Sequence, residues 1–357
     1  MTEIHQILVG AGQTDAITNM ARSLRQTLQT LGPSGIYAQH PAPDVIDVQH
    51  LNELSRHHTA SRVLIFHASG GDPEVFKFLK SSTDPIILIF HNIAPSELFE
   101  NFDSERAALL KRGWEELAEL RPKISLSIAD SKYNASCLEE IGYRNVEVLP
   151  IGITPNRLHS CKTDQTLEQL LKREAPGPLL LYVGQAVPHK RPEVLVQMQY
   201  LLSHHIGRTT SLALVGPPTM PQVNAVALEQ ARRLRVRGCL FLGQINENEL
   251  ATLYRKASVF VTASTHEGLC LPVIEAMSFG VPSVARRTAA LPDTLKDAGI
   301  LLPETAGPEL FAEAVGELLD NPQLSTQLSN RGKRRAATYS STSTSESFLS
   351  LLKQVSP

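Results

Sequence analysis

The sequence predicts an α/β protein with two doubly wound domains, each built on a parallel sheet covered by helices. Short apolar runs alternate with longer amphipathic stretches along the 357 residues, and a polar segment interrupts this pattern near the middle. Strands that alternate with helices form parallel sheets with crossover helices. The runs are continuously apolar, which is typical of strands buried on both faces. At roughly 150 residues per domain, the length also predicts two domains.

The expected elements follow from these runs. Strands are expected at residues 4–9, 63–66, 86–90, 125–129 and 146–149, and in the second half at 179–183, 211–215, 240–242, 259–262 and 283–285. Apolar residues at helical spacing predict helices at 14–31, 104–120, 192–202, 223–235 and 309–319.

The polar segment at residues 155–178 ends in Ala175-Pro-Gly-Pro178 and separates the two expected domains. We expect an N-terminal domain over residues 1–170 and a C-terminal domain over residues 171–339. A terminal helix within residues 340–357 is expected to pack back on the first domain. The Ser/Thr-rich stretch 338–347 before it is expected to be flexible.

Composition excludes several classes of protein. The net charge is −2, so no global field attracts nucleic acid, and no nucleic-acid partner is expected. The four cysteines include no Cys-x-x-Cys pair, which argues against a zinc site or a disulfide framework. Glu3 and His5 interrupt any apolar leader, and the longest apolar runs are far shorter than the roughly 20 residues of a membrane span. We therefore expect a cytoplasmic protein, with peripheral contact at the inner face of the membrane as an alternative.

Ligands of open parallel sheets bind beyond the carboxyl ends of the strands, so candidate residues are sought there. Two facing domains would hold a ligand in the cleft between them. Gly10 and Gly12 follow the first strand and precede a helix, where free amides favour an anion. A tight turn with Asp15 near the helix start is the alternative. His67 and His91 each follow a strand, and the alternative for both is a polar residue at an element's end.

The segment 264–282 is the most informative part of the chain. Pro272 suits the first turn of a helix and Gly280 its end, which places Glu267 in the preceding loop and Glu275 about one turn inside. Their separation fits two parts of one extended ligand, although helix capping by Glu267 and a solvent-facing Glu275 remain open. Lys190 and its neighbour Arg191 stand at the entrance of another helix, where a lysine can neutralise a departing phosphate. A solvated basic pair is the alternative.

Together these segments resemble the retaining nucleotide-sugar glycosyltransferases of the GT-B fold, glycosyltransferase family 4 (group 1). The interval from Glu267 to Glu275 matches the Glu-x7-Glu motif of that family, within Glu-Gly-Leu-Cys-Leu-Pro-Val-Ile-Glu-Ala-Met-Ser-Phe-Gly-Val-Pro. The resemblance is strong over residues 178–300 and looser in the first half. It implies transfer of a sugar from a UDP- or GDP-linked donor to an acceptor hydroxyl, with retained configuration and without cofactor or metal. Carbohydrate or lipid-linked acceptors, as in glycan, polysaccharide or glycolipid biosynthesis, are the implied partners.

The resemblance also implies roles for individual residues. Glu267 would bind hydroxyls of the transferred sugar, Glu275 the ribose, Lys190 the diphosphate, and His91 the donor sugar near the reacting carbon. The remaining implied donor-binding positions are Gly10, Gly12, Gly184, Gln185, Arg191, Gly216, Gly268, Leu269, Cys270 and Leu271. Asp15 and His67 are expected on the acceptor side.

Two positions depart from the family pattern. Gln185 stands where the family usually has an arginine that binds the diphosphate, and Arg191 is the candidate to compensate. Gly268-Leu-Cys270 replaces Gly-Phe-Gly. The loss of a cation keeps open a non-catalytic nucleotide-sugar-binding protein of the same fold, and a sugar-nucleotide epimerase is a further alternative. The helix at residues 104–120 is interpreted as an ordinary amphipathic helix, with a membrane-surface helix as the alternative.

Overall fold

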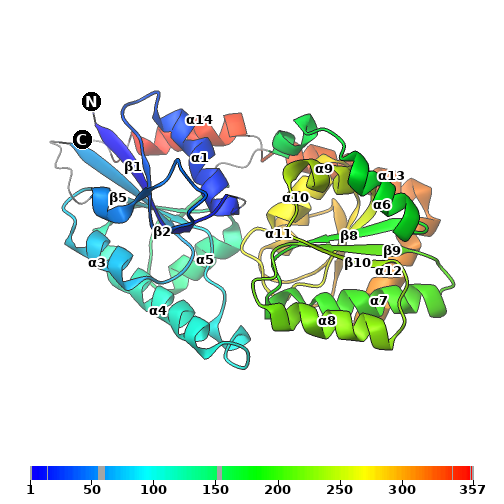
Figure 1. Ribbon diagram of the computed structural model, residues 1–357. Coiled ribbons are helices and arrows are strands. Elements are labelled where there is room, and N and C mark those ends of the chain that lie inside the picture. The colour runs from blue at the N-terminus through cyan, green and yellow to red at the C-terminus, as the bar shows by residue number, and fades with distance from the viewer. Residues whose placement is uncertain are drawn as a thin grey trace. The chain divides into compact units, whose positions relative to one another are not determined.

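The computed structural model describes residues 2–13, 15–54, 61–150, 155–339, 341–353 and 355. The chain divides into two compact units: unit 1 comprises Met1–Thr154 with Tyr339–Pro357, and unit 2 comprises Pro155–Thr338. In each unit a parallel sheet lies between two layers of helices (Figure 1). The predicted α/β class with two doubly wound parallel sheets is therefore confirmed.

The sheet of unit 1 has the strand order β3-β2-β1-β4-β5-β6-β7 among the described residues. Its strands are β1 (Glu3–Ala11), β2 (Ile36–Pro41), β3 (Gln49–His50), β4 (Arg62–Ala68), β5 (Ile86–Phe90), β6 (Ile124–Ala129) and β7 (Glu147–Val148). Its helices are α1 (Ala16–Leu28), α2 (Leu51–Leu54), α3 (Pro73–Ser81), α4 (Ser104–Leu120), α5 (Lys132–Glu140) and α14 (Ser341–Leu352), with 3-10 turns at Ser96–Leu98 and Arg121–Lys123.

Both faces of this sheet are buried. Along β4, Val63 and Ile65 pack with α1 and α14, whereas Leu64 and Phe66 pack with α3 and α4. Phe348 of α14 is completely buried in the first of these clusters. This two-sided burial explains why the strands are continuously apolar.

The sheet of unit 2 has the order β10-β9-β8-β11-β12-β13. Its strands are β8 (Leu179–Val183), β9 (Ser211–Val215), β10 (Cys239–Gly243), β11 (Ala257–Thr262), β12 (Ser283–Arg286) and β13 (Gly299–Leu302). Its helices are α6 (Gln165–Glu174), α7 (Pro192–His204), α8 (Pro221–Arg233), α9 (Glu247–Lys256), α10 (Leu271–Ser278), α11 (Leu291–Leu295), α12 (Pro308–Asp320) and α13 (Pro322–Ala337), with 3-10 turns at Pro155–Ser160 and Pro188–Lys190.

Local sequence signals explain where several of these helices begin. Proline occupies the first turn of α7, α8, α10, α12 and α13, where its missing N–H costs no helical hydrogen bond. Asn246 and Glu249 form a reciprocal capping box at the start of α9. On one face of the sheet, Tyr182, Leu214 and Val261 pack against α7, α8 and α12.

Some elements differ from the predictions. The strands β2, β3 and β13 were not expected. Only three apolar residues begin β2, β3 is the polar pair Gln49–His50, and β13 has three apolar residues after a glycine. Within the Ser/Thr-rich stretch 338–347, Ser341–Ser347 lie in α14, so the terminal helix begins earlier than expected. The helix expected from residue 14 begins at Ala16, and Thr14 lies outside the described residues.

The predicted domain boundary at residues 170 and 171 falls inside α6, a helix that contacts α9 of unit 2. As a functional boundary it stays a prediction. Within the described part of the chain, no helix combines the length and the apolarity that crossing a membrane requires.

Candidate functional site

In unit 2, two glycines hold the ends of β8 and β9 close together. The backbone N–H of Gly184 donates to the carbonyl oxygen of Val215 at 2.8 Å. Gly216 has a φ of +142°, and a Cβ there would overlap the carbonyl of Gly184. A Cβ on Gly184 would in turn crowd the hydroxyl of Tyr182. Both predicted positions therefore need glycine for the fold of this strand edge itself.

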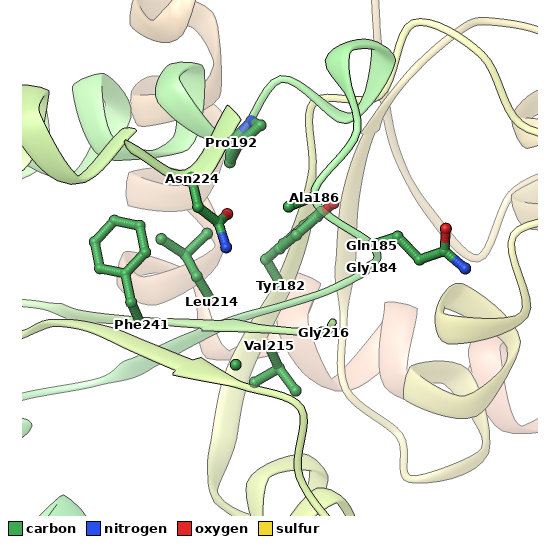
Figure 2. Close-up of a pocket in the computed structure, with 11 residues that line it drawn as sticks. Tyr182, Gly184, Gln185, Ala186, Pro192, Leu214, Val215, Gly216, Asn224 and Phe241 are labelled. Carbon is green, nitrogen blue, oxygen red and sulfur yellow. The ribbon is translucent and has the colours of Figure 1, made fainter. Parts of the chain in front are cut away.

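A small pocket lies behind this edge (Figure 2). Tyr182, Leu214 and Phe241 project into it from three strands, and Asn224 reaches it from α8. The Tyr182 hydroxyl is buried without a hydrogen-bond partner among the described residues. Gln185 is exposed and its side chain points away from these residues, and its Oε1 accepts a long hydrogen bond of 3.5 Å from the Thr219 hydroxyl.

The adjacent basic residues Lys190 and Arg191 form ion pairs with different partners. Lys190 Nζ donates to Glu267 Oε1 at 2.6 Å, and the side chains of Lys190 and Glu267 are 17% and 8% exposed. Arg191 has a left-handed backbone, with φ at +52°, and its guanidinium pairs with Glu193. The structure thus joins Lys190 to the signature segment and turns Arg191 toward its own helix.

The loop between β11 and α10 carries Glu267. Its backbone is fixed by hydrogen bonds from Thr265 N to the carbonyl of His189 at 2.8 Å and from Thr294 Oγ1 to the carbonyl of Leu269 at 2.7 Å. Leu269 is buried, whereas Gly268 and Leu271 are partly exposed. Within the part of the chain that the structure describes, no side chain caps the start of α10. Pro272 has no N–H, and the N–H of Val273 donates to the carbonyl oxygen of Cys270 at 3.1 Å. An anion or a sugar oxygen could therefore bind here through the backbone amides of Leu271 and of the loop before it.

Cys270 stands at the N-cap position of α10 in a left-handed conformation, with φ at +66° and ψ at +67°. This backbone region favours glycine, which the family pattern has at this position. The Cys270 thiol is buried and interacts with the Glu267 carboxylate, and burial raises its pKa well above the usual range. The substitution thus places a thiol against the carboxylate expected to bind sugar.

Glu275 lies inside α10 and is 8% exposed. Its Oε2 accepts a hydrogen bond of 2.9 Å from the hydroxyl of Tyr254, which is itself buried. Burial raises the pKa of Glu275 to about 6. Glu275 therefore does not lie on a solvent-facing side of the helix, and Glu267 makes no side-chain cap to α10. Both capping and simple solvent exposure are excluded for this pair.

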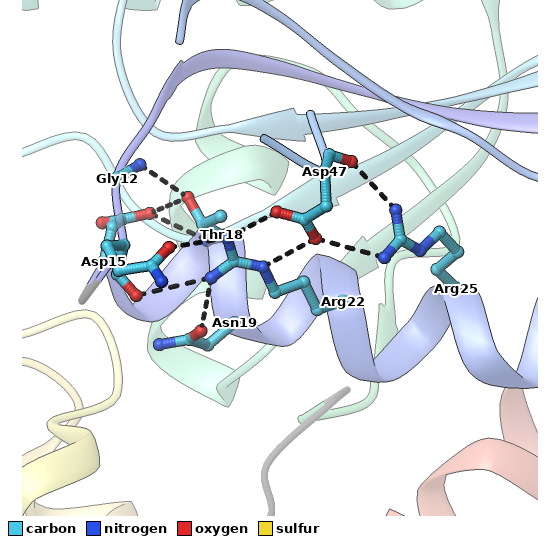
Figure 3. Close-up of polar contacts among 8 residues, drawn as sticks. Gly12, Asp15, Thr18, Asn19, Arg22, Arg25 and Asp47 are labelled. Atoms are coloured by element: carbon cyan, nitrogen blue, oxygen red, sulfur yellow. Dashed lines mark hydrogen bonds and ion pairs between the residues drawn. The ribbon is translucent and has the colours of Figure 1, made fainter. Parts of the chain in front are cut away.

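In unit 1, the end of β1 and the start of α1 form a polar turn (Figure 3). Asp15 caps α1: its Oδ2 accepts from the Thr18 backbone N–H and the Thr18 hydroxyl, both at 2.8 Å. The N–H of Gly12 donates to Thr18 Oγ1 at 3.2 Å. A Cβ on Gly10 or Gly12 would meet only ordinary contacts, so neither glycine is required by the turn. Their expected contact with the donor stays a prediction.

A network of ion pairs anchors α1 just beyond that turn (Figure 3). Arg22 forms a fork with both carboxylate oxygens of Asp47, at 2.7 and 2.9 Å, and Arg25 adds a third bond at 3.1 Å. The hydrogen bond from Arg22 lowers the pKa of Asp47. Arg22 also bonds Asn19, so these cations are engaged in holding α1 to the segment after β2.

His67 and His91 lie at the ends of neighbouring strands β4 and β5 and contact each other. His67 Nδ1 and His91 Nε2 are 2.9 Å apart, and His91 Nδ1 is 3.2 Å from Asp130 Oδ2. The second nitrogen of His67 meets Gln6 Oε1 at 2.9 Å. Both ring nitrogens of each histidine are therefore engaged within the protein.

The structure brings together Lys190, Glu267 and Cys270 in unit 2, and His67 with His91 in unit 1. Partners that sequence reasoning missed are Tyr254, Asp130, Asn134 and Gln6. Asp130 follows β6 directly, as His91 follows β5, so the strand-end rule could have selected it. Tyr254 and Gln6 lie within a helix and a strand and carry no such signal. Among the described residues, no cluster of three His, Cys, Asp or Glu side chains could hold a metal ion.

Comparison with known proteins now assigns the class. Residues 164–335 match the sequence profile of the family described as Glycosyl transferases group 1. The predicted resemblance to the group 1 glycosyltransferases is confirmed over this part of the chain.

Relatives with assigned names agree. The D-inositol 3-phosphate glycosyltransferase of Corynebacterium glutamicum is 27% identical over 205 residues, which cover 54% of this chain and 48% of that protein. The O-antigen chain mannosyltransferase B of Escherichia coli is 34% identical over 121 residues, 34% of this chain and 32% of that protein. The chain thus aligns with about half, or less, of the length of these relatives.

Solved structures share the fold over the full chain. Sucrose-phosphate synthase from Thermosynechococcus elongatus has a TM-score of 0.79 at 17% identity and covers 99% of both chains. The Anabaena protein Alr3699/HepE, solved in complex with UDP-glucose, has a TM-score of 0.78 at 15% identity, covering 98% of this chain and 99% of that one. The fold is that of the GT-B glycosyltransferases.

Proposed function

We propose that this protein is a retaining, metal-independent glycosyltransferase that moves a sugar from a UDP- or GDP-linked donor to an acceptor hydroxyl. The observation that supports this most is the Lys190–Glu267 pair beside the uncapped start of α10, with Glu275 one turn further along. A cation, backbone amides at a helix start and two carboxylates are the groups that a nucleoside diphosphate sugar needs.

In this proposal the donor replaces the Lys190–Glu267 ion pair. Lys190 turns to the diphosphate, and Glu267 becomes free to accept hydrogen bonds from sugar hydroxyls. Without the donor, each group keeps a partner, which avoids leaving a buried carboxylate unpaired. Glu275 accepts hydrogen bonds from the ribose hydroxyls, oriented by Tyr254.

The reaction breaks the bond between the anomeric carbon and the diphosphate oxygen and forms a bond from that carbon to the acceptor oxygen. The acceptor proton passes to the departing diphosphate, so attack occurs on the face that the diphosphate leaves. Lys190 and the amides of α10 stabilise the growing negative charge on the diphosphate. His91 and the glycines of unit 1 are proposed to contact the donor, and a carbohydrate or lipid-linked carbohydrate is the proposed acceptor, in glycan or polysaccharide synthesis at a cytoplasmic location.

A thermal-shift panel of UDP-, GDP- and ADP-sugars followed by a transfer assay tests this function. A donor at about 100 times its Kd adds about 2.7 kcal/mol of stability, or about 5–10 °C in a unit of this size. We expect one nucleotide class to give this shift and to release free nucleoside diphosphate when acceptor hydroxyls are supplied. Lys190→Ala should abolish the release, whereas Lys256→Ala, which breaks another lysine ion pair of unit 2, should not. Absence of a shift with every nucleotide sugar contradicts the proposal.

Gln185 favours one second candidate, a nucleotide-sugar-binding protein without transfer activity. Its neutral, exposed amide stands at the strand edge, and Arg191, the expected substitute, is paired with Glu193. A shift without release or epimerisation of the donor would support this candidate.

A further inference from the structure

A chain of buried and half-buried polar side chains crosses the carboxyl edge of the unit 1 sheet behind His91. Asn92 Nδ2 donates to Asn134 Oδ1 at 2.7 Å, and Asn134 Nδ2 donates to Asp130 Oδ1 at 2.5 Å. Beyond the His91–Asp130 and His67–His91 contacts, Gln6 Nε2 ends the chain by donating to the carbonyl oxygen of Ala21 at 2.9 Å.

The donor and acceptor roles of the groups at one end determine which atom donates in each hydrogen bond of this chain. A carbonyl only accepts, so Gln6 must turn its amide nitrogen to Ala21 and its oxygen to His67. His67 Nε2 therefore carries the proton that it donates to Gln6. Burial disfavours the charged form of His67 and lowers its pKa well below the usual value, so its Nδ1 is an acceptor.

His91 Nε2 must then be the donor to His67 Nδ1. The two ring planes are within 4° of each other with centroids 5.2 Å apart, so this hydrogen bond lies in the plane of both rings. One further proton lies between His91 Nδ1 and Asp130. The His91 ring is thereby held from both sides, and its side chain is 4% exposed.

We propose that His67 is a positioning residue for His91: it fixes the orientation of the His91 ring and the proton on its Nε2 by accepting that proton's hydrogen bond. The expectation that His67 binds the acceptor is thereby replaced, because His67 lies inside β4, is 1% exposed and has both ring nitrogens engaged, whereas His91 lies beyond the end of β5 and is partly exposed as a residue. The consequence for catalysis rests on the proposed function, whereas the placement of the proton does not.

Nitrogen-detected NMR of histidine-labelled protein tests the placement. In the wild type we expect protonated Nε2 atoms on both His67 and His91. A His91 Nε2 without a proton would overturn the proposal before any variant is made. His67→Leu removes the acceptor and should release the fixed state of His91, whereas His67→Gln supplies an amide oxygen and an N–H at similar positions and should keep it.

Kinetics separate positioning from a merely structural role. We expect His67→Leu to lower kcat about 10- to 100-fold with the donor KM within about threefold, and His67→Gln to recover most of kcat. The matched control is His5→Leu, which removes another buried histidine with two partners, Glu3 and Gly35, at the opposite end of the same sheet. It should lose stability and keep kcat.

The outcomes remain distinct if a variant fails. Equal loss of kcat in His67→Gln and His67→Leu, with the proton of His91 retained in the former, overturns positioning. If His67→Leu does not fold, Gln6→Leu removes the acceptor of the His67 Nε2 proton, so the tautomer of His67 should no longer be fixed. An unchanged His67 tautomer in Gln6→Leu contradicts the proposed order of donors and acceptors. If the wild type transfers no sugar from any donor, the proposed function fails, and the NMR result still decides the role of His67.

Discussion

Replacing Glu275 by glutamine should stabilise the ligand-free protein and weaken its binding of nucleotide. Burial raises the pKa of Glu275 from an ordinary 4.5 to about 6, so its ionised form is less favourable in the folded protein than in the unfolded chain. Glutamine has no charge to bury, and its amide oxygen can still accept the hydrogen bond from Tyr254. The variant therefore removes the electrostatic cost and keeps the local geometry.

The magnitude follows from the displacement of the pKa. A change from 4.5 to about 6 corresponds to about 2 kcal/mol of folding free energy, at about 1.4 kcal/mol per pKa unit. Below pH 4.5 the carboxyl of Glu275 is protonated in both states, and this cost is absent. As the pH rises from 4.5 through 6 the folded protein holds the proton longer than the unfolded chain, so stability falls, and above pH 6 the full cost persists.

Calorimetry at pH 4.5 and pH 8 measures the difference between the two proteins. The variant should unfold about 4–8 °C higher at pH 8 and at the same temperature at pH 4.5. Burial also lowers the pKa of His266 to about 4, so protonation of His266 destabilises the folded protein as the pH falls over an overlapping range. Because this effect is the same in both proteins, the difference between variant and wild type isolates Glu275.

Titration calorimetry supplies the second half of the test. Loss of hydrogen bonds from the ribose to a charged acceptor should weaken nucleotide binding about 10- to 100-fold. A Glu275→Gln protein that is less stable than wild type at pH 8, or a difference that does not change with pH, would refute the desolvation argument. Unchanged nucleotide affinity would refute the ribose assignment alone.

Three further substitutions probe other parts of the structure. Lys190→Ala should lower kcat at least 100-fold in a donor-release assay, because it removes the cation from the departing diphosphate. Phe348→Ala should destabilise unit 1 by about 3–5 kcal/mol; the fluorescence of the single tryptophan, Trp114, reports this during denaturation. Gly216→Ala should lower the melting temperature and donor affinity together, since its Cβ overlaps the Gly184 backbone, whereas Gly207→Ala, also at positive φ but with nothing within 4 Å, should leave donor affinity unchanged.

The long-range pattern of the fold was predictable because each strand is buried on both faces. Continuous apolar runs such as 86–90 leave little choice of structure, and the observed β5 has the same bounds. The strand β2 escaped prediction because only Ile36, Tyr37 and Ala38 are buried before polar residues follow. The Ser-rich start of α14 escaped for another reason: tertiary packing of Phe348 and Leu352 outweighs the weak helix propensity of serine and threonine.

Site residues were predictable to the extent that backbone topology alone places them. Parallel strands end at one edge of their sheet, so His67 near the end of β4, and His91, Gly184 and Gly216 just after their strands, could be located from the strand positions. Which side chains join one another depends on rotamers and on the distance between loops, and no spacing rule contains that information. The Lys190–Glu267 contact spans 77 positions, and Gln6 lies 61 positions from His67.

The departures from the family pattern acquire different meanings once the partners are known. Gln185 points outward, and Arg191, the expected substitute for the lost cation, is paired with Glu193. In the proposed function the diphosphate would therefore rely on Lys190 and backbone amides. Cys270 accepts a backbone conformation that costs a non-glycine residue about 1–2 kcal/mol. A buried thiol held at that cost against Glu267 changes the shape and polarity of the predicted sugar site. We therefore expect substitutions at Cys270 to change the selectivity for the donor sugar, and substitutions at Gln185 to change the affinity for the donor.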